Sequence, residues 1–459
     1  MFKLCYRFTK AHLPVFKQYP LHPKILEILD TKGLHTATPV QDMLFTCQNK
    51  VRLLIGPTGT GKTYAYLLPI LGKLKQEEEE QNKILTEENK PRAIVVVSTK
   101  ELAEQVEDVS QEFTKAMKLS TLALGKGTFK KEQTYLKEGV DLVVTTLDRL
   151  QRHRSAQSIY LSRVSHYVVD EIDTLLDSSM QDDLKKLATY FKDKDITTTY
   201  CGATYSTKVK NFVESQYKNQ ITPLIEKQSH MHLENLSHDF VHCTTLDKSE
   251  PFMALYKECQ NKFKGSIIIF CNEISSCHFL EFFCKKNGIK TVSLHGDLPK
   301  GMRSQNVAEF RSQQCKVLIT TDLGARGLDF PFVDAVINFD FPNSTSDYLH
   351  RAGRAGRAGK KGFIYSLYHN SEQSVIDELR KANEGERPIR IEESAYSKTN
   401  KEDSPKGKVI KSKSQEQQQS KTKSQRQHYV KGYKPAQKQT KQERTTSKSY
   451  FKKVHEGKV

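Results

Sequence analysis

The sequence predicts two successive α/β domains, each built on a parallel sheet, followed by a basic tail that does not fold by itself. Three observations support this prediction: short apolar runs alternate with helical patterns, the series of runs starts again halfway along the chain, and the composition changes near residue 395. The chain has 459 residues, of which 37% are hydrophobic, and this is enough for two or three domains with apolar cores.

Five short apolar runs predict the strands of the first domain, at residues 51–55, 93–97, 141–145, 167–169 and 198–201. The runs lack a strict alternation of apolar and polar residues, which favours parallel strands covered on both faces. Helical patterns such as residues 100–115 separate them. The polar stretch that contains four glutamates at 77–80 predicts an exposed acidic insert.

Six further runs predict the second domain, at residues 240–243, 266–270, 291–294, 316–320, 335–338 and 363–368. Two series of alternating strands and helices favour two α/β domains. The periodicity lapses around 223–237, where we expect the join. The predicted division is a basic extension at 1–15, domains at 16–228 and 229–394, and a tail at 395–459.

The basic excess of the chain is concentrated in this tail. The net charge is +18, and residues 397–459 hold 18 Lys and Arg against 5 Asp and Glu, a balance of +13. A segment so rich in Lys, Gln and Ser cannot bury enough surface to fold alone, and its charge favours a polyanionic partner. A solvated tail that only aids solubility is the alternative. Aromatic rings between the lysines would stack on unpaired bases; they are Tyr429, Tyr433, Tyr450 and Phe451.

The cysteines and the amino-terminal residues bear on the compartment. Nine scattered cysteines without a C-x-x-C pair suit a reducing compartment. No run approaches the ~20 apolar residues of a membrane span, so no membrane partner is expected. Residues 1–26 lack Asp and Glu and contain five Lys and Arg, as organelle transit peptides do. We expect a mitochondrial address, with the nucleus, the nucleolus or the cytoplasm as alternatives.

A phosphate-binding loop is predicted at residues 56–63, where the pattern G-x-x-x-x-G-K-T follows a strand and precedes a helix. Glycines let backbone N–H groups surround phosphate oxygens at a helix N-terminus. Lys62 should reach the β- and γ-phosphates, and Thr63 should ligate Mg²⁺. The other candidate nucleotide-binding residues of the loop are Thr58, Gly59, Thr60 and Gly61.

The second half of this site is predicted at Asp170 and Glu171, which end an apolar strand. Asp170 is placed to hold Mg²⁺, and Glu171 to accept a proton from the attacking water. Adjacent acids are more often a solvated surface, but the strand before them and the phosphate loop upstream favour catalysis.

Together these motifs resemble the DEAD-box RNA helicases, a family with two tandem RecA-like domains, over residues 16–391. Residues 170–173, Asp-Glu-Ile-Asp, stand at the family's Asp-Glu-Ala-Asp. Residues 33–41 resemble the family's Q motif. The resemblance implies that Gln41 reads the adenine edge and that Phe16 stacks on the ring, so the nucleotide is ATP with Mg²⁺.

In the second domain, residues 350–357 resemble the family's arginine-finger motif, which implies that Arg354 and Arg357 meet the phosphoryl group in its transition state. A solvated or RNA-facing basic stripe is the alternative. Residues 320–329 resemble motif V, with Asp329 at the ribose. Residues 269–272, Arg303 and 310–311 resemble further RNA-side motifs.

The resemblance also implies an RNA surface and a coupling between the domains. The expected RNA-binding residues are Thr99, Lys100, Thr146, Arg149, Thr320 and Arg326. The expected coupling residues are Asp173, Gly202, Ala203, Thr204 and His350. RNA would be bound through its backbone with little sequence preference, by a monomer. The flanks at 173–177 and 339–350 resemble the organellar, ribosome-assembly branch, so ribosomal RNA or a pre-ribosomal particle is an expected partner.

Several positions depart from the family pattern. Ser98 and Lys100 stand at its Pro and Arg, Asp148 falls in its Pro-Gly pair, and Gly202 lacks the serine hydroxyl that links the acid motif to domain closure. We therefore expect intact ATP hydrolysis with weak strand separation. An ATP-gated RNA clamp stays open as an alternative, and so does a DNA translocase, which the Q motif and residues 350–357 disfavour.

Overall fold

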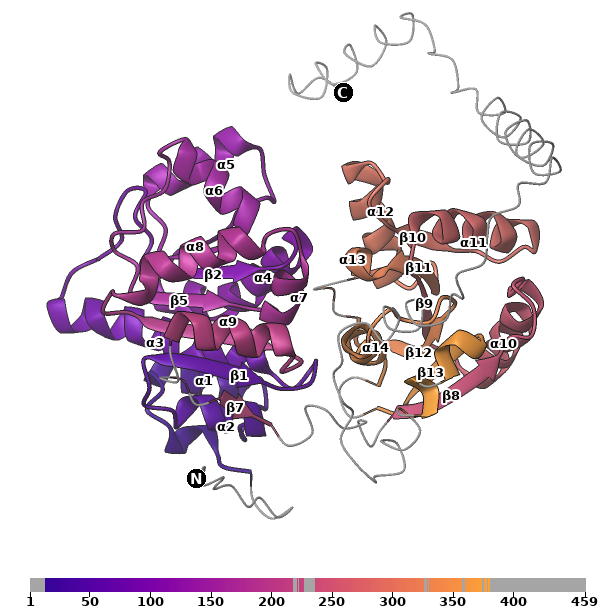
Figure 1. The fold of residues 1–459 in the computed structure, drawn as a ribbon. Helices are drawn as coiled ribbons and strands as arrows, with labels where there is room; N and C mark the ends of the chain where they lie inside the picture. Colours follow the sequence, from indigo (N-terminus) through magenta and orange to yellow (C-terminus); the bar gives the residue numbers. More distant parts are fainter. Residues whose placement is uncertain are drawn as a thin grey trace, which may run out of the picture. The chain divides into compact units, whose positions relative to one another are not determined.

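The computed structural model describes residues 13–217, 221, 223–226, 236–325, 328, 330–356, 360–373, 375–377 and 379. The predicted extension at 1–15 lies almost wholly outside these residues, and the tail at 395–459 lies entirely outside them. The described residues form two parallel sheets with helices on both faces (Figure 1). We call residues up to 226 the first lobe and residues from 236 the second lobe.

In the first lobe, seven strands within the described residues pair in the order β3-β4-β2-β5-β6-β1-β7, all parallel. Their bounds are β1 (Val51–Ile55), β2 (Ala93–Val97), β3 (Thr121–Ala123), β4 (Leu142–Thr146), β5 (His166–Val169), β6 (Thr197–Gly202) and β7 (Pro223–Ile225). The five predicted strands are present within one residue at either end. Two strands of three residues, β3 and β7, were not predicted, because so short a segment carries no periodicity.

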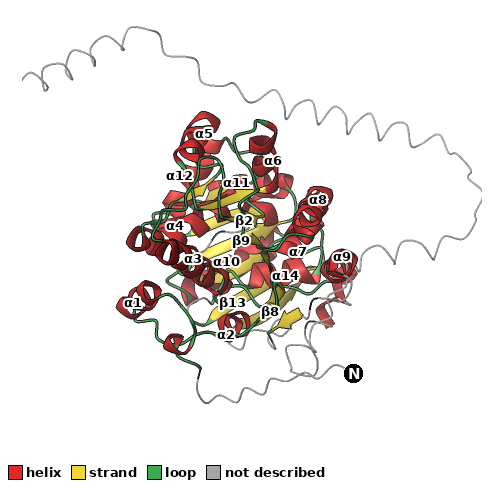
Figure 2. Ribbon diagram, turned by 90° about the vertical axis from the view of Figure 1, so that its left-hand side faces the viewer, coloured by secondary structure: helices red, strands yellow, loops and turns green. Residues whose placement is uncertain are grey.

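Helices cover both faces of the first sheet (Figure 2). One face packs against α1 (Pro23–Thr31), α2 (Pro39–Phe45), α3 (Lys62–Gln81) and α4 (Lys100–Met117). The other packs against α5 (Phe129–Glu138), α6 (Leu147–Ser155), α7 (Ile172–Asp177), α8 (Gln181–Lys192) and α9 (Thr207–Tyr217). Burial on both faces explains the uninterrupted apolar runs, such as the fully buried Ala93–Val97.

In the second lobe, six strands within the described residues pair in the order β10-β11-β9-β12-β13-β8, again all parallel. Their bounds are β8 (Leu236–His242), β9 (Ser266–Cys271), β10 (Val292–Leu294), β11 (Val317–Thr321), β12 (Val333–Asn338) and β13 (Gly362–Tyr368). The helices are α10 (Ser249–Lys262), α11 (Ile274–Lys286), α12 (Lys300–Arg311), α13 (Asp322–Ala325) and α14 (Thr345–Ala352). All six predicted strands are present.

The prediction of an exposed acidic insert at 77–80 was wrong in part, because Glu79 and Glu80 are exposed but all four glutamates belong to a helix. They lie in the last turns of α3, and Glu78 is only 5% exposed. Arg92 donates to Glu78 at 2.6 Å and to Asp141 at 2.9 Å, and all three side chains are buried. The pairing joins α3 to the start of β2, and the local sequence gives no sign of it.

The sheets place the candidate motifs at one edge. Parallel strands share the edge at which they end, and ligands of open α/β sheets bind there. The phosphate loop follows β1, Ser98 and Thr99 follow β2, Asp170 follows β5, and Ala203 follows β6.

Candidate functional site

The phosphate loop at 56–63 joins β1 to α3. Gly59 and Gly61 have φ of +79° and +89°, values that L side chains rarely adopt. A Cβ on Gly61 would also lie 2.5 Å from Nε2 of Gln41. Lys62 lies across the loop and donates to the carbonyls of Gly56 at 2.7 Å and Pro57 at 2.8 Å. Burial lowers the pKa of Lys62, and Asp170 opposes this shift.

The Q motif contacts the phosphate loop directly. Nε2 of Gln41 donates to the Gly61 carbonyl at 3.2 Å, and Oγ1 of Thr38 donates to the Thr60 carbonyl at 2.8 Å. Oε1 of Gln41 accepts from the backbone N–H of Thr38, which closes a capping box at α2. Gln41 therefore orients the loop as well as lying beside it. Phe16 is 4% exposed and packs in the apolar core that also contains residues of α1, α2, α3 and α4.

Asp170 lies behind the phosphate loop, next to Tyr66 of α3. Its carboxylate accepts from the Tyr66 hydroxyl at 3.0 Å and from the Glu171 N–H at 2.9 Å. Burial and the neighbouring Glu171 raise the pKa of Asp170 to about 6, against the opposing effect of Lys62. A buried carboxylate of this kind is stabilised as an anion by a cation. Its oxygens and the hydroxyl of Thr63 are the hard donors that Mg²⁺ prefers, so these residues fit a Mg²⁺ site.

Glu171 has a backbone φ of +53°, in the left-handed region that non-glycine residues seldom adopt. Such strain is maintained only where the surrounding structure fixes it, and it clusters at functional sites. The Ser98 hydroxyl donates to Oε2 of Glu171. Ser98, which departs from the family pattern, thus contacts the residue predicted to be the catalytic base.

Asp173 joins the acid motif to β6. Its Oδ2 accepts from the backbone N–H groups of Ala203 at 3.0 Å and Thr204 at 2.8 Å, and from Oγ1 of Thr204 at 2.9 Å. Nε2 of His350 is 3.3 Å away. Burial acts to raise the pKa of Asp173, but the charge and hydrogen bond of His350 and the Thr204 bonds outweigh it, so the pKa is well below its usual range. Asp173 thus has partners although position 202 has no hydroxyl.

The arginine motif at 350–357 begins in α14. The partners of its Arg351 come from the segments that follow β9, β11 and β12. Arg351 is fully buried and donates to both carboxylate oxygens of Asp322 at 2.6 Å and to Asn272 at 2.7 Å. Arg354 is 6% exposed and donates to the Leu328 carbonyl at 2.6 Å. Arg357 lies outside the described residues.

Among the described residues, two further contacts join the first lobe to α14 and to the arginine motif that follows from it. Oγ1 of Thr204 is 3.2 Å from Oγ of Ser346, and Oγ1 of Thr58 donates to the Gly353 carbonyl at 3.3 Å. The phosphate loop therefore contacts the arginine motif, and the 202–204 segment contacts α14 just before it.

The RNA-binding candidates of the first lobe lie at the ends of β2 and β4. Thr99 caps α4 and is 8% exposed, while Lys100 is about one-third exposed and pairs with Glu104 at 3.2 Å. Thr146 donates to Asp148 at 2.5 Å. Asp148, which departs from the family pattern, therefore accepts a hydrogen bond from Thr146.

Arg149 is held by a buried carboxylate. Glu132 of α5 accepts from Arg149 at 2.7 Å and from the Gly125 N–H at 2.8 Å, and His153 lies 2.8 Å from it. Glu132 is 1% exposed. Burial acts to raise its pKa, but the bonds from His153, the Gly125 N–H and Arg149 outweigh burial, so the pKa is lowered. The Arg149 guanidinium is thus oriented before any ligand binds.

Thr320 has a fully buried side chain at the end of β11, and its hydroxyl donates to the Leu294 carbonyl at 2.8 Å. This bond holds β11 against β10, and the predicted contact of Thr320 with RNA stays a prediction. The other two motif V candidates, Arg326 and Asp329, lie outside the described residues.

Sequence reasoning missed four residues that complete these arrangements: Tyr66, Glu132, His153 and Ser346. Each lies on a helix: Tyr66, Glu132 and Ser346 contact candidate residues on other segments, and His153 supports Glu132. The pattern of their own helices gives no signal for these contacts, which only the folded chain creates.

The fold and the site define a nucleotide-binding protein with a phosphate loop in the first of two RecA-like domains. Residues 38–212 match the family model described as DEAD/DEAH box helicase, and residues 250–359 match the helicase conserved C-terminal domain. The chain belongs to the DEAD-box ATP-dependent RNA helicase family.

Relatives and solved structures agree with this assignment. DEAD-box ATP-dependent RNA helicase 20 of Arabidopsis thaliana is 31% identical over 75% of this chain and 68% of its own length. DEAD-box ATP-dependent RNA helicase 39 of the same plant is 29% identical over 82% of this chain, which spans 62% of that relative's length. The structure of S. cerevisiae Dbp5 bound to RNA and ADP BeF3 is 25% identical, with a TM-score of 0.70 over 80% of this chain and 93% of Dbp5.

Membership in the family does not specify a compartment. Within the described residues, no helix combines the length and the apolar character needed to cross a membrane.

Proposed function

We propose that the chain is an RNA-stimulated ATPase that grips RNA through its backbone and locally unwinds or remodels RNA and RNA–protein complexes. The observation that carries the proposal is the 3.3 Å approach of Asp173, in the acid motif, to His350, in the arginine motif. The two motifs belong to different lobes, so hydrolysis depends on how the lobes meet. Binding of ATP and RNA favours the closed arrangement, and loss of the γ-phosphate reopens it.

In this proposal each lobe supplies half of the chemistry. Lys62 binds the β- and γ-phosphates, Glu171 accepts a proton from the attacking water, and Arg354 and Arg357 stabilise the charge that moves to the leaving oxygen. Thr63 and Asp170 would hold Mg²⁺, which neutralises phosphate charge when bound. The contact between the buried Asp173 carboxylate and His350 favours closure.

Nucleotide selection is proposed for residues around the phosphate loop. Gln41 reads the adenine edge, Phe16 packs against the ring, and Asp329 binds the ribose. The support for Gln41 is its hydrogen bond to the Gly61 carbonyl, which places its amide at the loop.

RNA binding is proposed for Thr99, Lys100, Thr146, Arg149 and Arg326. Contacts to phosphates and 2′-hydroxyls give little sequence preference. The support is the fixed orientation of Arg149 by Glu132, because a preoriented guanidinium loses less side-chain entropy when it binds a phosphate.

The test is Glu171→Gln, measured by RNA-stimulated ATP hydrolysis and by release of a short duplex. General base catalysis typically contributes 10²–10⁴-fold, so we expect ATP turnover to fall by at least ~10²-fold while RNA binding persists. Glu80→Gln, an exposed change at the end of α3, is the control and should leave turnover unchanged. Turnover by Glu171→Gln at the parent rate would refute the assigned chemistry.

The second candidate function is an ATP-gated RNA clamp whose slow hydrolysis only times release. The absence of a hydroxyl at Gly202 favours it, because that group would link the acid motif to closure. A clamp should still hold RNA with Glu171→Gln, whereas a remodeller should stall. Gly202→Ser is a demanding test, because its Cβ would lie 3.3 Å from both Ile172 and Ile55. Robust duplex release by the parent chain that Gly202→Ser does not improve would show that the missing hydroxyl is unimportant.

A DNA translocase is the third candidate, and competition by 2′-deoxy strands in the ATPase assay decides it. An RNA-specific enzyme should be stimulated by RNA and not by the matching DNA.

We further propose ribosomal RNA or a pre-ribosomal particle in mitochondria as the biological target, bound by a monomer. The support is the acid-poor basic start of the sequence and the flanks of the acid and arginine motifs. Crosslinking the chain in cells and sequencing the bound RNA tests target and compartment together; cytosolic messenger RNA alone would contradict the proposal.

A further inference from the structure

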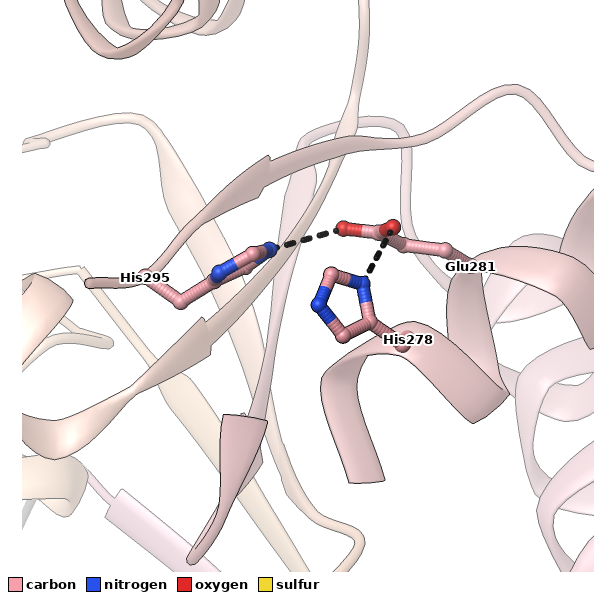
Figure 3. Close-up of side chains that lie close together, drawn as sticks. All are labelled: His278, Glu281 and His295. Atoms are coloured by element: carbon pink, nitrogen blue, oxygen red, sulfur yellow. Dashed lines mark hydrogen bonds and ion pairs between the residues drawn. The ribbon is translucent and has the colours of Figure 1, made fainter. Parts of the chain in front are cut away.

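Three side chains that can ligate a metal gather in the second lobe, apart from the phosphate loop and the acid motif. His278 and Glu281 lie one turn apart on α11, and His295 directly follows β10 (Figure 3). One ligand atom from each residue can be chosen so that all three lie within 4.8 Å of one another. Within the part of the chain that the structure describes, this is the one group of three or more such residues.

Each imidazole lies about one ligand-to-ligand spacing from the Glu281 carboxylate, through a different oxygen, and the three ligand atoms would close from within 4.8 Å to about 3.3 Å around one ion. Oε2 of Glu281 is 3.4 Å from Nδ1 of His278, and Oε1 is 3.2 Å from Nε2 of His295. Tetrahedral Zn²⁺ binds nitrogen and oxygen at about 2.0–2.2 Å, which sets neighbouring ligand atoms about 3.3 Å apart. In Figure 3 both imidazoles are turned toward the carboxylate. A second carboxylate, Asp297, lies 3.9 Å from Nε2 of His278.

Burial gives the group an inner and an outer side. The His295 side chain is 1% exposed, and its Nδ1 has no hydrogen-bond partner among the described residues. The polar contact of this buried imidazole is therefore Glu281, which it shares with His278. The His278 side chain is 53% exposed, so an ion can enter from solvent and water can complete its shell.

We propose that His278, Glu281 and His295 form a binding site for a divalent transition-metal ion, with Zn²⁺ as the best match. Two imidazoles and one carboxylate are a ligand set that Zn²⁺ accepts, whereas Mg²⁺ and Ca²⁺ prefer oxygen ligands alone. The ion would take the place of the two contacts that now join the carboxylate to the rings.

The site would join α11 to the segment that leads from β10 into α12. That segment contains Asp297, and α12 carries Arg303, one of the residues that resemble the family's RNA-side motifs. A bound ion would therefore fix the start of α12 relative to α11 without touching the nucleotide site.

The test is a zinc titration of the full chain, stripped with a chelator and measured by competition with a fluorescent zinc indicator. The parent should bind one equivalent through this site. His278→Ala should weaken that binding by more than the ~10–100-fold typical of losing an outer-shell partner, because a ligand itself is lost. The matched control is His35→Ala, which removes an exposed imidazole that pairs with Asp30 at 3.2 Å but belongs to no group of three. It should bind as the parent does.

X-ray absorption of the zinc-loaded chain separates this site from the cysteines. The proposal requires nitrogen and oxygen neighbours at about 2.0–2.1 Å, and a sulfur shell at about 2.3 Å would overturn it. The proposal also fails if the parent binds no zinc, or if His278→Ala binds as tightly as the parent. In either case the two histidines simply share a carboxylate by hydrogen bonds.

Discussion

Replacing Asp173 by Asn tests whether the acid motif is held by the hydrogen bonds described above. The carboxylate accepts from Ala203, from the Thr204 N–H and hydroxyl, and from the Thr174 N–H at 3.1 Å, with His350 beside it. Asparagine offers one acceptor oxygen, and its NH₂ group only donates. Whichever way the asparagine amide is turned, at least one of these buried N–H or O–H donors therefore faces its NH₂ group and has no acceptor.

The free-energy cost of Asp173→Asn follows from these hydrogen bonds. A buried donor left unpaired costs about 1–3 kcal/mol, and each remaining bond weakens by about 1 kcal/mol when its acceptor loses its charge. The total is about 4 kcal/mol, within the range of about 3–5 kcal/mol for breaking a buried ion pair. At about 1.4 kcal/mol per tenfold, local opening of this segment should become roughly a thousandfold more frequent.

Hydrogen exchange of the Ala203 and Thr204 amides, followed by mass spectrometry, measures this opening directly. RNA-stimulated ATP hydrolysis should fall in parallel, because the contact with His350 is lost. Asp177→Asn is the matched control on the same helix. Asp177 and its partner Lys208 are both 40% exposed, and such surface pairs contribute only about 0–1 kcal/mol. If Asp173→Asn exchanged no faster than this control, the assigned hydrogen bonds would not be what holds the segment.

Three further predictions concern ionisable side chains. Glu132→Gln should weaken RNA binding about tenfold and leave RNA-free nucleotide binding unchanged, because Arg149 loses its orientation; equilibrium binding at two salt concentrations checks this. Burial and neighbouring cations lower the pKa of His166 from its ordinary 6.5 to about 4. The unfolded chain therefore binds a proton first, and stability should fall by about 3 kcal/mol as the pH drops from above 6.5 to below 4. Urea unfolding of His166→Gln should lack that component. Arg351→Lys should lose at least ~3 kcal/mol in urea unfolding of the second lobe, since an ammonium cannot donate to two carboxylate oxygens in a fork; the exposed Arg311→Lys should not.

The sequence predicted the two sheets well because their strands are buried on both faces. Burial on both faces leaves uninterrupted apolar runs such as Ala93–Val97, which need no tertiary information to recognise. The two strands that were not predicted, β3 and β7, have three residues each, and their pairing is decided by neighbours in the sheet.

The phosphate loop and the acids were predictable because their chemistry lies in consecutive residues. The contacts of the acid motif were not, because they join distant segments: Tyr66 to Asp170, and Thr204 to Ser346. For the same reason the partner of Glu78 could not be found by reading its own helix. Nor does the sequence indicate that the hydroxyl of Thr320, a residue predicted to bind RNA, also holds β11 against β10.

The close approach of Gly353 to Thr58 makes position 353 a steric control point. A Cβ there would lie 1.7 Å from Oγ1 and 3.0 Å from Cβ of Thr58, so with alanine either the Thr58 side chain must turn or the two segments must shift. Either response breaks the hydrogen bond between Thr58 and the Gly353 carbonyl as it now stands. A single added methyl group at position 353 would therefore change how the phosphate loop contacts the arginine motif.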